Sequence, residues 1–140
     1  MIAIVWSKYH KEITDGLLAG AKEILAENEI PFFDKDLFVA PGAFEMPLIA
    51  KKIAESGKYQ GVVCLGCVIK GDTAHFEYIS DATAHGLQNV ALQTGVPIGF
   101  GILTTYNEEQ ALLRSRSNTD NKGREATLAV VKSVKLLSKF

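Results

Sequence analysis

A nine-residue apolar run constrains the fold of this chain more than any other feature. Residues 61–69, Gly-Val-Val-Cys-Leu-Gly-Cys-Val-Ile, contain no charged side chain and offer no polar face. A strand of this kind is buried on both sides, which is typical of the centre of a parallel sheet covered by helices. Shorter runs at residues 2–6, 37–39 and 98–103 predict three further strands. The sequence therefore predicts a four-stranded parallel sheet.

Segments with helical spacing of apolar residues separate these strands. The predicted helices cover residues 13–25, 44–55, 74–93, 108–114 and 124–139. Strands that alternate with helices indicate parallel βαβ units with helices on both faces of the sheet. Neither a repeat nor a linker divides the 140 residues. We therefore predict one domain, residues 1–140, folded as a flavodoxin-like three-layer α/β/α sandwich. In the helix over residues 44–55, we expect the inner side to carry Leu48, Ile49, Ile53 and Ala54.

Charge and hydropathy exclude several classes of protein. Fifteen Lys and Arg oppose sixteen Asp and Glu, for a formal net charge of -1. This balance argues against a nucleic-acid binder, which usually carries a basic excess. No apolar stretch reaches the roughly 18–20 residues of a membrane span. The N-terminus opens on a strand-like run, so we expect no signal peptide and a cytoplasmic location.

The segment between the most apolar strand and the longest helix is rich in chemically capable groups. In parallel α/β sheets, ligands bind beyond the carboxyl ends of the strands. Residues 70–75, Lys-Gly-Asp-Thr-Ala-His, lie at such an end, and the free amides of the helix start can bind an anion. The imidazole of His75 could transfer a proton beside that anion. In the alternative interpretation, Asp72 or Thr73 only caps the helix and His75 is a surface residue.

Other candidate groups follow the remaining strands, each with a plainer explanation. Glu45, in Pro-Gly-Ala-Phe-Glu, could accept hydrogen bonds from ligand hydroxyls, but Pro-Gly is a common turn and Glu is favoured in a first helical turn. Tyr9 could stack on a planar ligand or pack on its own domain. Arg114 and Lys122 belong to a basic late segment that could bind an anion or simply be solvated.

Cys64 and Cys67 form a C-x-x-C pair that invites a redox or metal interpretation. Strand geometry opposes it, because residues three apart point to opposite faces and lie roughly 10 Å apart. A disulfide needs Cα atoms within about 7 Å. No second Cys or His pair stands at zinc spacing. We therefore predict no metal site and no redox role for this pair.

Several segments, spread over nearly the whole chain, follow one another in a specific order and spacing. They are residues 39–47 (Val-Ala-Pro-Gly-Ala-Phe-Glu-Met-Pro), 65–78 (Leu-Gly-Cys-Val-Ile-Lys-Gly-Asp-Thr-Ala-His-Phe-Glu-Tyr), 101–105 (Gly-Ile-Leu-Thr-Thr), 109–111 (Glu-Gln-Ala) and 121–123 (Asn-Lys-Gly). In this order and spacing they resemble the 6,7-dimethyl-8-ribityllumazine synthase family. The resemblance implies a transferase of riboflavin biosynthesis that acts at the penultimate step. It condenses 5-amino-6-(D-ribitylamino)uracil with 3,4-dihydroxy-2-butanone 4-phosphate and releases phosphate and water, without a metal or organic cofactor.

The resemblance also assigns a role to each matching position. His75 is expected to transfer protons, and Tyr9 to stack on the uracil ring. The other residues expected to bind the ribitylaminouracil are Ala43, Phe44, Glu45, Cys67, Val68, Ile69 and Phe100. Those expected to bind the butanone phosphate are the amides of Asp72 and Thr73 together with Arg114, and Lys122 is a further candidate.

The resemblance further implies a homo-oligomer with active sites between subunits. Phe100, Arg114 and Lys122 are expected to come from the neighbouring subunit. We expect a pentamer that binds small-molecule substrates, and neither nucleic acid nor a membrane. Whether it assembles further, into a decamer or a sixty-subunit shell, stays open, because family members commonly carry an N-terminal arm that adds a strand to a neighbour and this chain begins at the next strand.

One departure from the family pattern leaves other functions open. Residues 116–118 are Arg-Ser-Asn, where members usually have Gly-Thr-Lys. A basic group near the phosphate is then lost or moved to Arg116. This departure and the short N-terminus leave room for a non-catalytic module that binds flavin-like ligands. Fold class alone suggests a further alternative, a flavodoxin-like electron carrier.

Overall fold

The computed structural model describes all 140 residues and contains one parallel sheet. Its strands are β1 (Ile2–Ser7), β2 (Leu37–Ala40), β3 (Gly61–Ile69) and β4 (Ile98–Thr105). The spatial order is β2-β1-β3-β4, and every neighbouring pair is parallel. The apolar run that forms β3 therefore lies inside the sheet, as its sequence predicts. The predicted four-stranded parallel sheet is confirmed.

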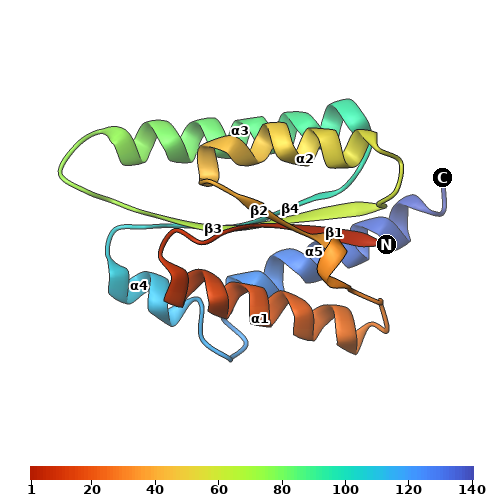
Figure 1. Cartoon of the computed structure of the whole chain (residues 1–140), viewed down its shortest axis with the longest axis horizontal. Coiled ribbons are helices and arrows are strands. Elements are labelled where there is room, and N and C mark those ends of the chain that lie inside the picture. Colours follow the sequence, from red (N-terminus) through yellow and green to blue (C-terminus); the bar gives the residue numbers. More distant parts are fainter.

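Helices cover both faces of the sheet. They are α1 (Lys11–Glu27), α2 (Met46–Glu55), α3 (His75–Thr94), α4 (Glu108–Leu113) and α5 (Lys122–Leu137), with short 3-10 turns η1 (Asp34–Asp36) and η2 (Ala43–Glu45). Figure 1 shows α2 and α3 above the sheet and α1, α4 and α5 below it. The chain is thus a three-layer α/β/α sandwich, as predicted. None of these helices combines the length and the apolar character needed to cross a bilayer.

Each face of the sheet has its own hydrophobic core. Val63, Leu65 and Cys67 of β3 point into the core between the sheet and the layer of α1 and α5. Val62 and Cys64 point into the opposite core, between the sheet and the layer of α2 and α3. This alternation is the period-two pattern of a strand. The two cysteines therefore lie on opposite faces and are both free, as the strand geometry predicted.

The inner face of α2 differs from the prediction in one residue. Ile53 and Ala54 are buried and Ile49 is half-buried, but Leu48 is 66% exposed. Met46 is fully buried in its place. The reason is that Ala43–Glu45 form a 3-10 turn, so the α-helix begins only at Met46 and its inward stripe starts from that residue.

The last helix begins two residues earlier than predicted. Its first residue is Lys122 rather than Arg124, because the side chain of Asn121 accepts a hydrogen bond from the backbone N–H of Arg124 and caps the helix. The start of α5 is thereby fixed to a polar side chain.

Candidate active site

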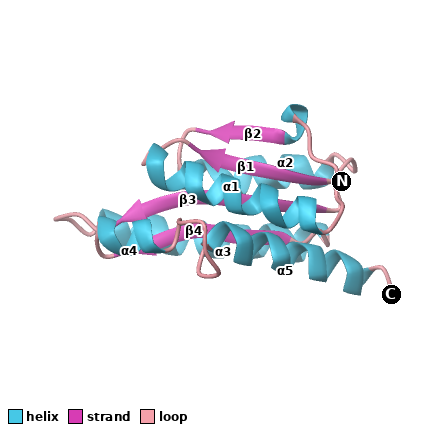
Figure 2. Ribbon diagram, turned by 90° about the horizontal axis from the view of Figure 1, so that it is seen from below, coloured by secondary structure: helices cyan, strands magenta, loops and turns pink.

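The carboxyl ends of the four strands meet at one edge of the sheet, the left edge in Figure 2. Two hollows lie toward this edge. The first is formed by the ends of β1, β2 and β3 together with the start of α3. The second is formed along β4 by α4 and the start of α5. The two hollows divide the predicted site residues between them.

The first hollow has a volume of about 600 Å³. This hollow is lined by most of the residues predicted to bind the ribitylaminouracil and by the residue predicted to transfer protons. These are Tyr9, Ala43, Phe44, Glu45, Cys67, Val68, Ile69 and His75. Two loops, the end of β3 and the start of α3 thus converge on one space, as expected for a site beyond parallel strands.

Tyr9 stands in the loop that follows β1. Its ring is 70% exposed and meets the ring of His10 edge-on, with centroids 5.4 Å apart. The turn is held by a hydrogen bond from the Tyr9 N–H to the buried Ser7 hydroxyl and by a left-handed backbone at His10 (φ 59°). The ring is therefore not packed into its own domain. One face is free to stack on a planar ligand.

Phe44 and Glu45 stand on the η2 turn that follows β2. Both are exposed, whereas Ala43 is buried and anchors the turn to the sheet. The turn therefore brings a carboxylate acceptor to the same hollow.

The loop from Lys70 to Ala74 leads into the exposed start of α3. Thr73 Oγ1 accepts the backbone N–H of His75 at 3.3 Å. The N-cap of α3 is Ala74, however, and no side chain caps this helix, so the interpretation of Asp72 or Thr73 as its cap is wrong. Neither residue lines the first hollow, although His75 does. His75 is exposed at the rim of the hollow, in reach of a ligand rather than engaged in a core contact.

The second hollow has a volume of about 810 Å³ and holds the predicted cations. Arg114, at the end of α4, and Lys122, at the start of α5, both line it together with Phe100. Arg114 Nη1 donates to the Gln110 carbonyl at 3.1 Å. Lys122 Nζ lies 3.1 Å from Glu125 Oε1. Within one chain, the predicted cations and His75 therefore belong to different hollows.

Tyr106 is a lining residue that the sequence reasoning missed. It follows β4 directly, is 68% exposed and lines the second hollow. The Lys70 ammonium lies 5.6 Å from its ring centroid, and the Phe76 ring lies 6.1 Å away. An aromatic side chain directly after a strand was the available signal. Tyr106 links the loop before α3 to the second hollow.

The cysteines provide no reactive group. Burial raises the pKa of the Cys64 thiol to about 12. Burial, with a smaller effect of Glu108, also raises the pKa of Cys67 to about 12. Both thiols are neutral near pH 7, and a thiol is a poor nucleophile. Nor do any three His, Cys, Asp or Glu side chains cluster in a way that could hold a metal ion.

The fold and the first hollow define an α/β protein with a hollow beyond the carboxyl ends of its parallel strands. Comparison with known sequences identifies it further: the chain belongs to the 6,7-dimethyl-8-ribityllumazine synthase family, whose profile matches residues 1–138. The family predicted from the sequence is confirmed.

Three relatives show how far the similarity extends. The chain is 54% identical over 139 residues to 6,7-dimethyl-8-ribityllumazine synthase 1 of Caulobacter vibrioides, which covers 99% of this chain and 91% of the relative. It is 46% identical over 135 residues to the 6,7-dimethyl-8-ribityllumazine synthase of Deinococcus deserti, covering 96% and 86%. It is 44% identical over 138 residues to that of Nitratidesulfovibrio vulgaris, covering 99% and 88%.

Proposed function

We propose that this chain condenses 5-amino-6-(D-ribitylamino)uracil with 3,4-dihydroxy-2-butanone 4-phosphate to form 6,7-dimethyl-8-ribityllumazine, phosphate and water. Membership of the family supports this reaction. The observation that carries the assignment of residues is the first hollow, where a free aromatic ring, a carboxylate and an imidazole line one space. Those groups suit a planar heterocycle that bears a polyol and reacts with proton transfer.

The ribitylaminouracil would occupy the first hollow. The exposed ring of Tyr9 would stack on the uracil, and the Glu45 carboxylate would accept hydrogen bonds from the ribityl hydroxyls. The end of β3, Cys67 to Ile69, would present backbone groups to the edge of the pyrimidine. Ala43 and Phe44 would complete the wall beside the ribityl chain.

His75 would transfer the protons of the reaction. The amine of the uracil attacks the ketone and loses water to give an imine. Loss of phosphate then leaves an enol that tautomerises to a second carbonyl, and the ribityl-bearing nitrogen closes the ring on that carbonyl with loss of a second water. Each step moves a proton, which a positioned imidazole can give or take. Holding both substrates in one geometry would supply much of the remaining acceleration, because proximity can contribute about 7–11 kcal/mol.

The phosphate would be held by amides of Asp72 and Thr73, near the start of α3, and by cations from another copy of the chain. Arg114, Lys122 and Phe100 line the second hollow, on the β4 side of the same chain. A ring of copies can join the second hollow of one subunit to the first hollow of the next, through a heterologous interface. This arrangement accounts for a cationic group that lies apart from His75 within each chain.

Exposed apolar side chains support such an assembly. Leu48 of α2 and Tyr78 and Leu92 of α3 are all largely exposed in the single chain. The layer formed by α2 and α3 therefore presents apolar surface that an interface between copies could cover. The proposal therefore includes the homo-oligomer expected from the sequence, a pentamer, together with a cytoplasmic location.

Three measurements on the purified protein test the proposal. Mixing it with both substrates should produce the absorbance of the lumazine, and sedimentation should give the mass of a pentamer or a multiple of it. No product at any substrate concentration, from folded oligomer, would remove the proposed activity. If calorimetry then showed tight binding of a flavin, the chain would be a non-catalytic binding module instead.

A further inference from the structure

We propose that Asn121 is a positioning residue of the active site: its buried side chain ties the segment that carries Arg114 and Lys122 to the backbone of α1. The inference rests on the proposed function, in which these two cations serve the butanone phosphate. Asn121 itself does not line the second hollow. It would therefore act through the two cations rather than on the substrate.

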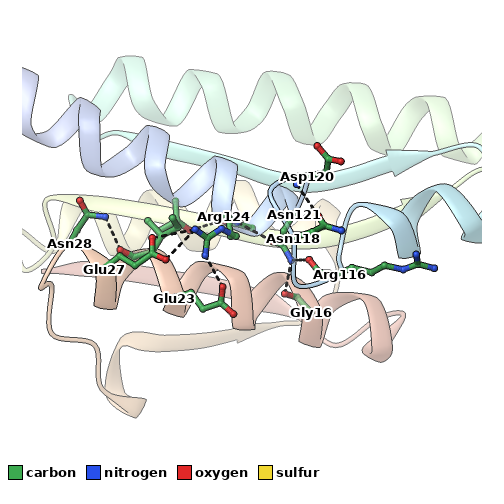
Figure 3. A network of polar contacts seen from close by, with 12 residues as sticks. Gly16, Glu23, Glu27, Asn28, Arg116, Asn118, Asp120, Asn121 and Arg124 are labelled. Atoms are coloured by element: carbon green, nitrogen blue, oxygen red, sulfur yellow. Dashed lines mark hydrogen bonds and ion pairs between the residues drawn. The ribbon is translucent and has the colours of Figure 1, made fainter.

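The side chain of Asn121 uses both ends in hydrogen bonds, although only 1% of the residue is exposed. Its Nδ2 donates to the Gly16 carbonyl at 3.1 Å and to the Arg116 carbonyl at 2.8 Å. Its Oδ1 accepts the backbone N–H of Arg124 at 3.1 Å. Figure 3 shows this side chain between α1 and the loop that precedes α5. Both donor hydrogens and the carbonyl oxygen are therefore engaged.

Two glycines allow α1 to approach this loop closely. A Cβ at Gly16 would collide with the Ser115 carbonyl oxygen. A Cβ at Gly20 would collide with Asn121 Oδ1. Helix interiors disfavour glycine, so its presence at the contact fits a close approach of backbone to loop. The contact holds the loop against α1.

Each cation is connected directly to this contact. Lys122 follows Asn121 in sequence, and its backbone N–H donates to the Arg114 carbonyl at 2.8 Å. The segment from Arg114 to Lys122 is thereby closed on itself, and Asn121 fastens the closed segment to α1. A shift of Asn121 should therefore move the guanidinium and the ammonium together.

Helix capping alone does not explain these bonds. Asn107 caps α4 by accepting the Gln110 N–H at 2.9 Å. It is exposed, and its side-chain amide donates no hydrogen bond to another element. Asn121 performs the same capping for α5 but adds two donated hydrogen bonds, one of them to a residue 105 positions away. These two added bonds hold the loop to α1 and to itself.

Two variants perturb the tie from opposite sides. Asn121→Ser keeps a good capping oxygen, but its side chain is too short to reach the carbonyls of Gly16 and Arg116. Gly20→Ala leaves Asn121 in the sequence and displaces its Oδ1 from the α1 side, where alanine favours the helix. Arg124→Gln is the matched control. It removes the ion pairs to Glu23 and Glu27 between the same two helices without removing a side-chain bond of Asn121.

Steady-state kinetics at a temperature well below the Tm of each variant provide the test, with Arg114→Ala as the reference. We expect Asn121→Ser and Gly20→Ala each to raise the KM for the butanone phosphate roughly tenfold, because small misplacements of binding groups are costly. The inhibition constant of inorganic phosphate should rise in parallel. The KM for the ribitylaminouracil should stay unchanged, and Arg124→Gln should change neither KM.

The outcomes separate the inference from the proposed function. If Arg114→Ala raises the KM for the butanone phosphate and both tie variants leave it unchanged, the positioning role of Asn121 is wrong. The role is also wrong if both KM values rise together, or if Arg124→Gln has the same effect, since general loosening would then explain the data. If the wild-type protein shows no turnover, the proposed function fails instead. If Asn121→Ser does not fold, Gly20→Ala alone decides.

Discussion

Replacing Arg114 with alanine should weaken the enzyme for one substrate only. The guanidinium lines the second hollow and is exposed, so its removal leaves no cavity in either core. Arg114 is the C-cap residue that follows α4, and the substitution leaves the backbone hydrogen bond from the Lys122 N–H to the Arg114 carbonyl in place. The expected change is therefore in binding of the phosphate rather than in folding.

The magnitude follows from the number of donors that are free. A hydrogen bond to a charged group contributes about 1.5–3 kcal/mol. One of the five N–H donors of Arg114, on Nη1, already binds the Gln110 carbonyl at 3.1 Å, so the guanidinium is partly engaged within its own chain. We therefore expect the lower end, about 1.5 kcal/mol, which corresponds to roughly a tenfold rise in KM for the butanone phosphate.

A lumazine-absorbance assay with each substrate varied in turn measures this effect. Arg116→Ala is the matched control, because Arg116 has the same charge, lies two residues away and does not line the hollow. It should leave both KM values unchanged. The reasoning is refuted if Arg114→Ala leaves the KM for the butanone phosphate as it was. An effect of Arg116→Ala equal to that of Arg114→Ala would show that the basic group has moved to Arg116.

Three further predictions follow from the first hollow and the strand beneath it. His75→Ala should lower kcat about 10²–10⁴-fold while the substrates still bind, as measured by kinetics and calorimetry; a full kcat would exclude proton transfer by His75. Tyr9→Ala should weaken binding of the ribitylaminouracil several-fold, because aromatic stacking contributes about 0.5–1.5 kcal/mol. Because burial raises the pKa of Cys64 and Cys67 to about 12, both thiols should resist alkylation in the native state. The stability gained from keeping them neutral should be complete below about pH 8.5, where unfolded thiols are also neutral, and should be lost as the pH rises toward the folded pKa. Urea unfolding across that pH range should show the free energy of unfolding fall as the pH rises. In Cys64→Ala this fall should be smaller, because one of the two buried thiols is absent.

The fold was predictable because each element has a local cause. The run from Gly61 to Ile69 has no polar face, so only the inside of a covered sheet suits it. The phase of α2 was not predictable in the same way. Whether Leu48 faces inward depends on where the α-helix starts, and the 3-10 turn at Ala43–Glu45 sets that start through contacts with the sheet.

The candidate site was only partly accessible to sequence reasoning. That His75 and Glu45 would lie at one edge follows from the rule that parallel strands end together. That Arg114 would line a different hollow does not follow from spacing, because it depends on how α4 packs beside β4. The resemblance to the family suggested that His75 and Arg114 come from different subunits, and the spacing of apolar residues carries no such information. The role of Asn121 could not be predicted, because a buried contact between residues 105 positions apart leaves no local pattern in the sequence.

The central claim, that one site takes His75 from one subunit and Arg114 from the next, can be tested by mixing two defective chains. His75→Ala and Arg114→Ala chains are unfolded, mixed in equal amounts and refolded together, then assayed at a butanone phosphate concentration too low for Arg114→Ala. Random assembly into a ring should restore about one quarter of the wild-type sites, because an intact His75 then meets an intact Arg114 from its neighbour. Activity no greater than the sum of the two variants refolded separately would contradict a site shared between subunits.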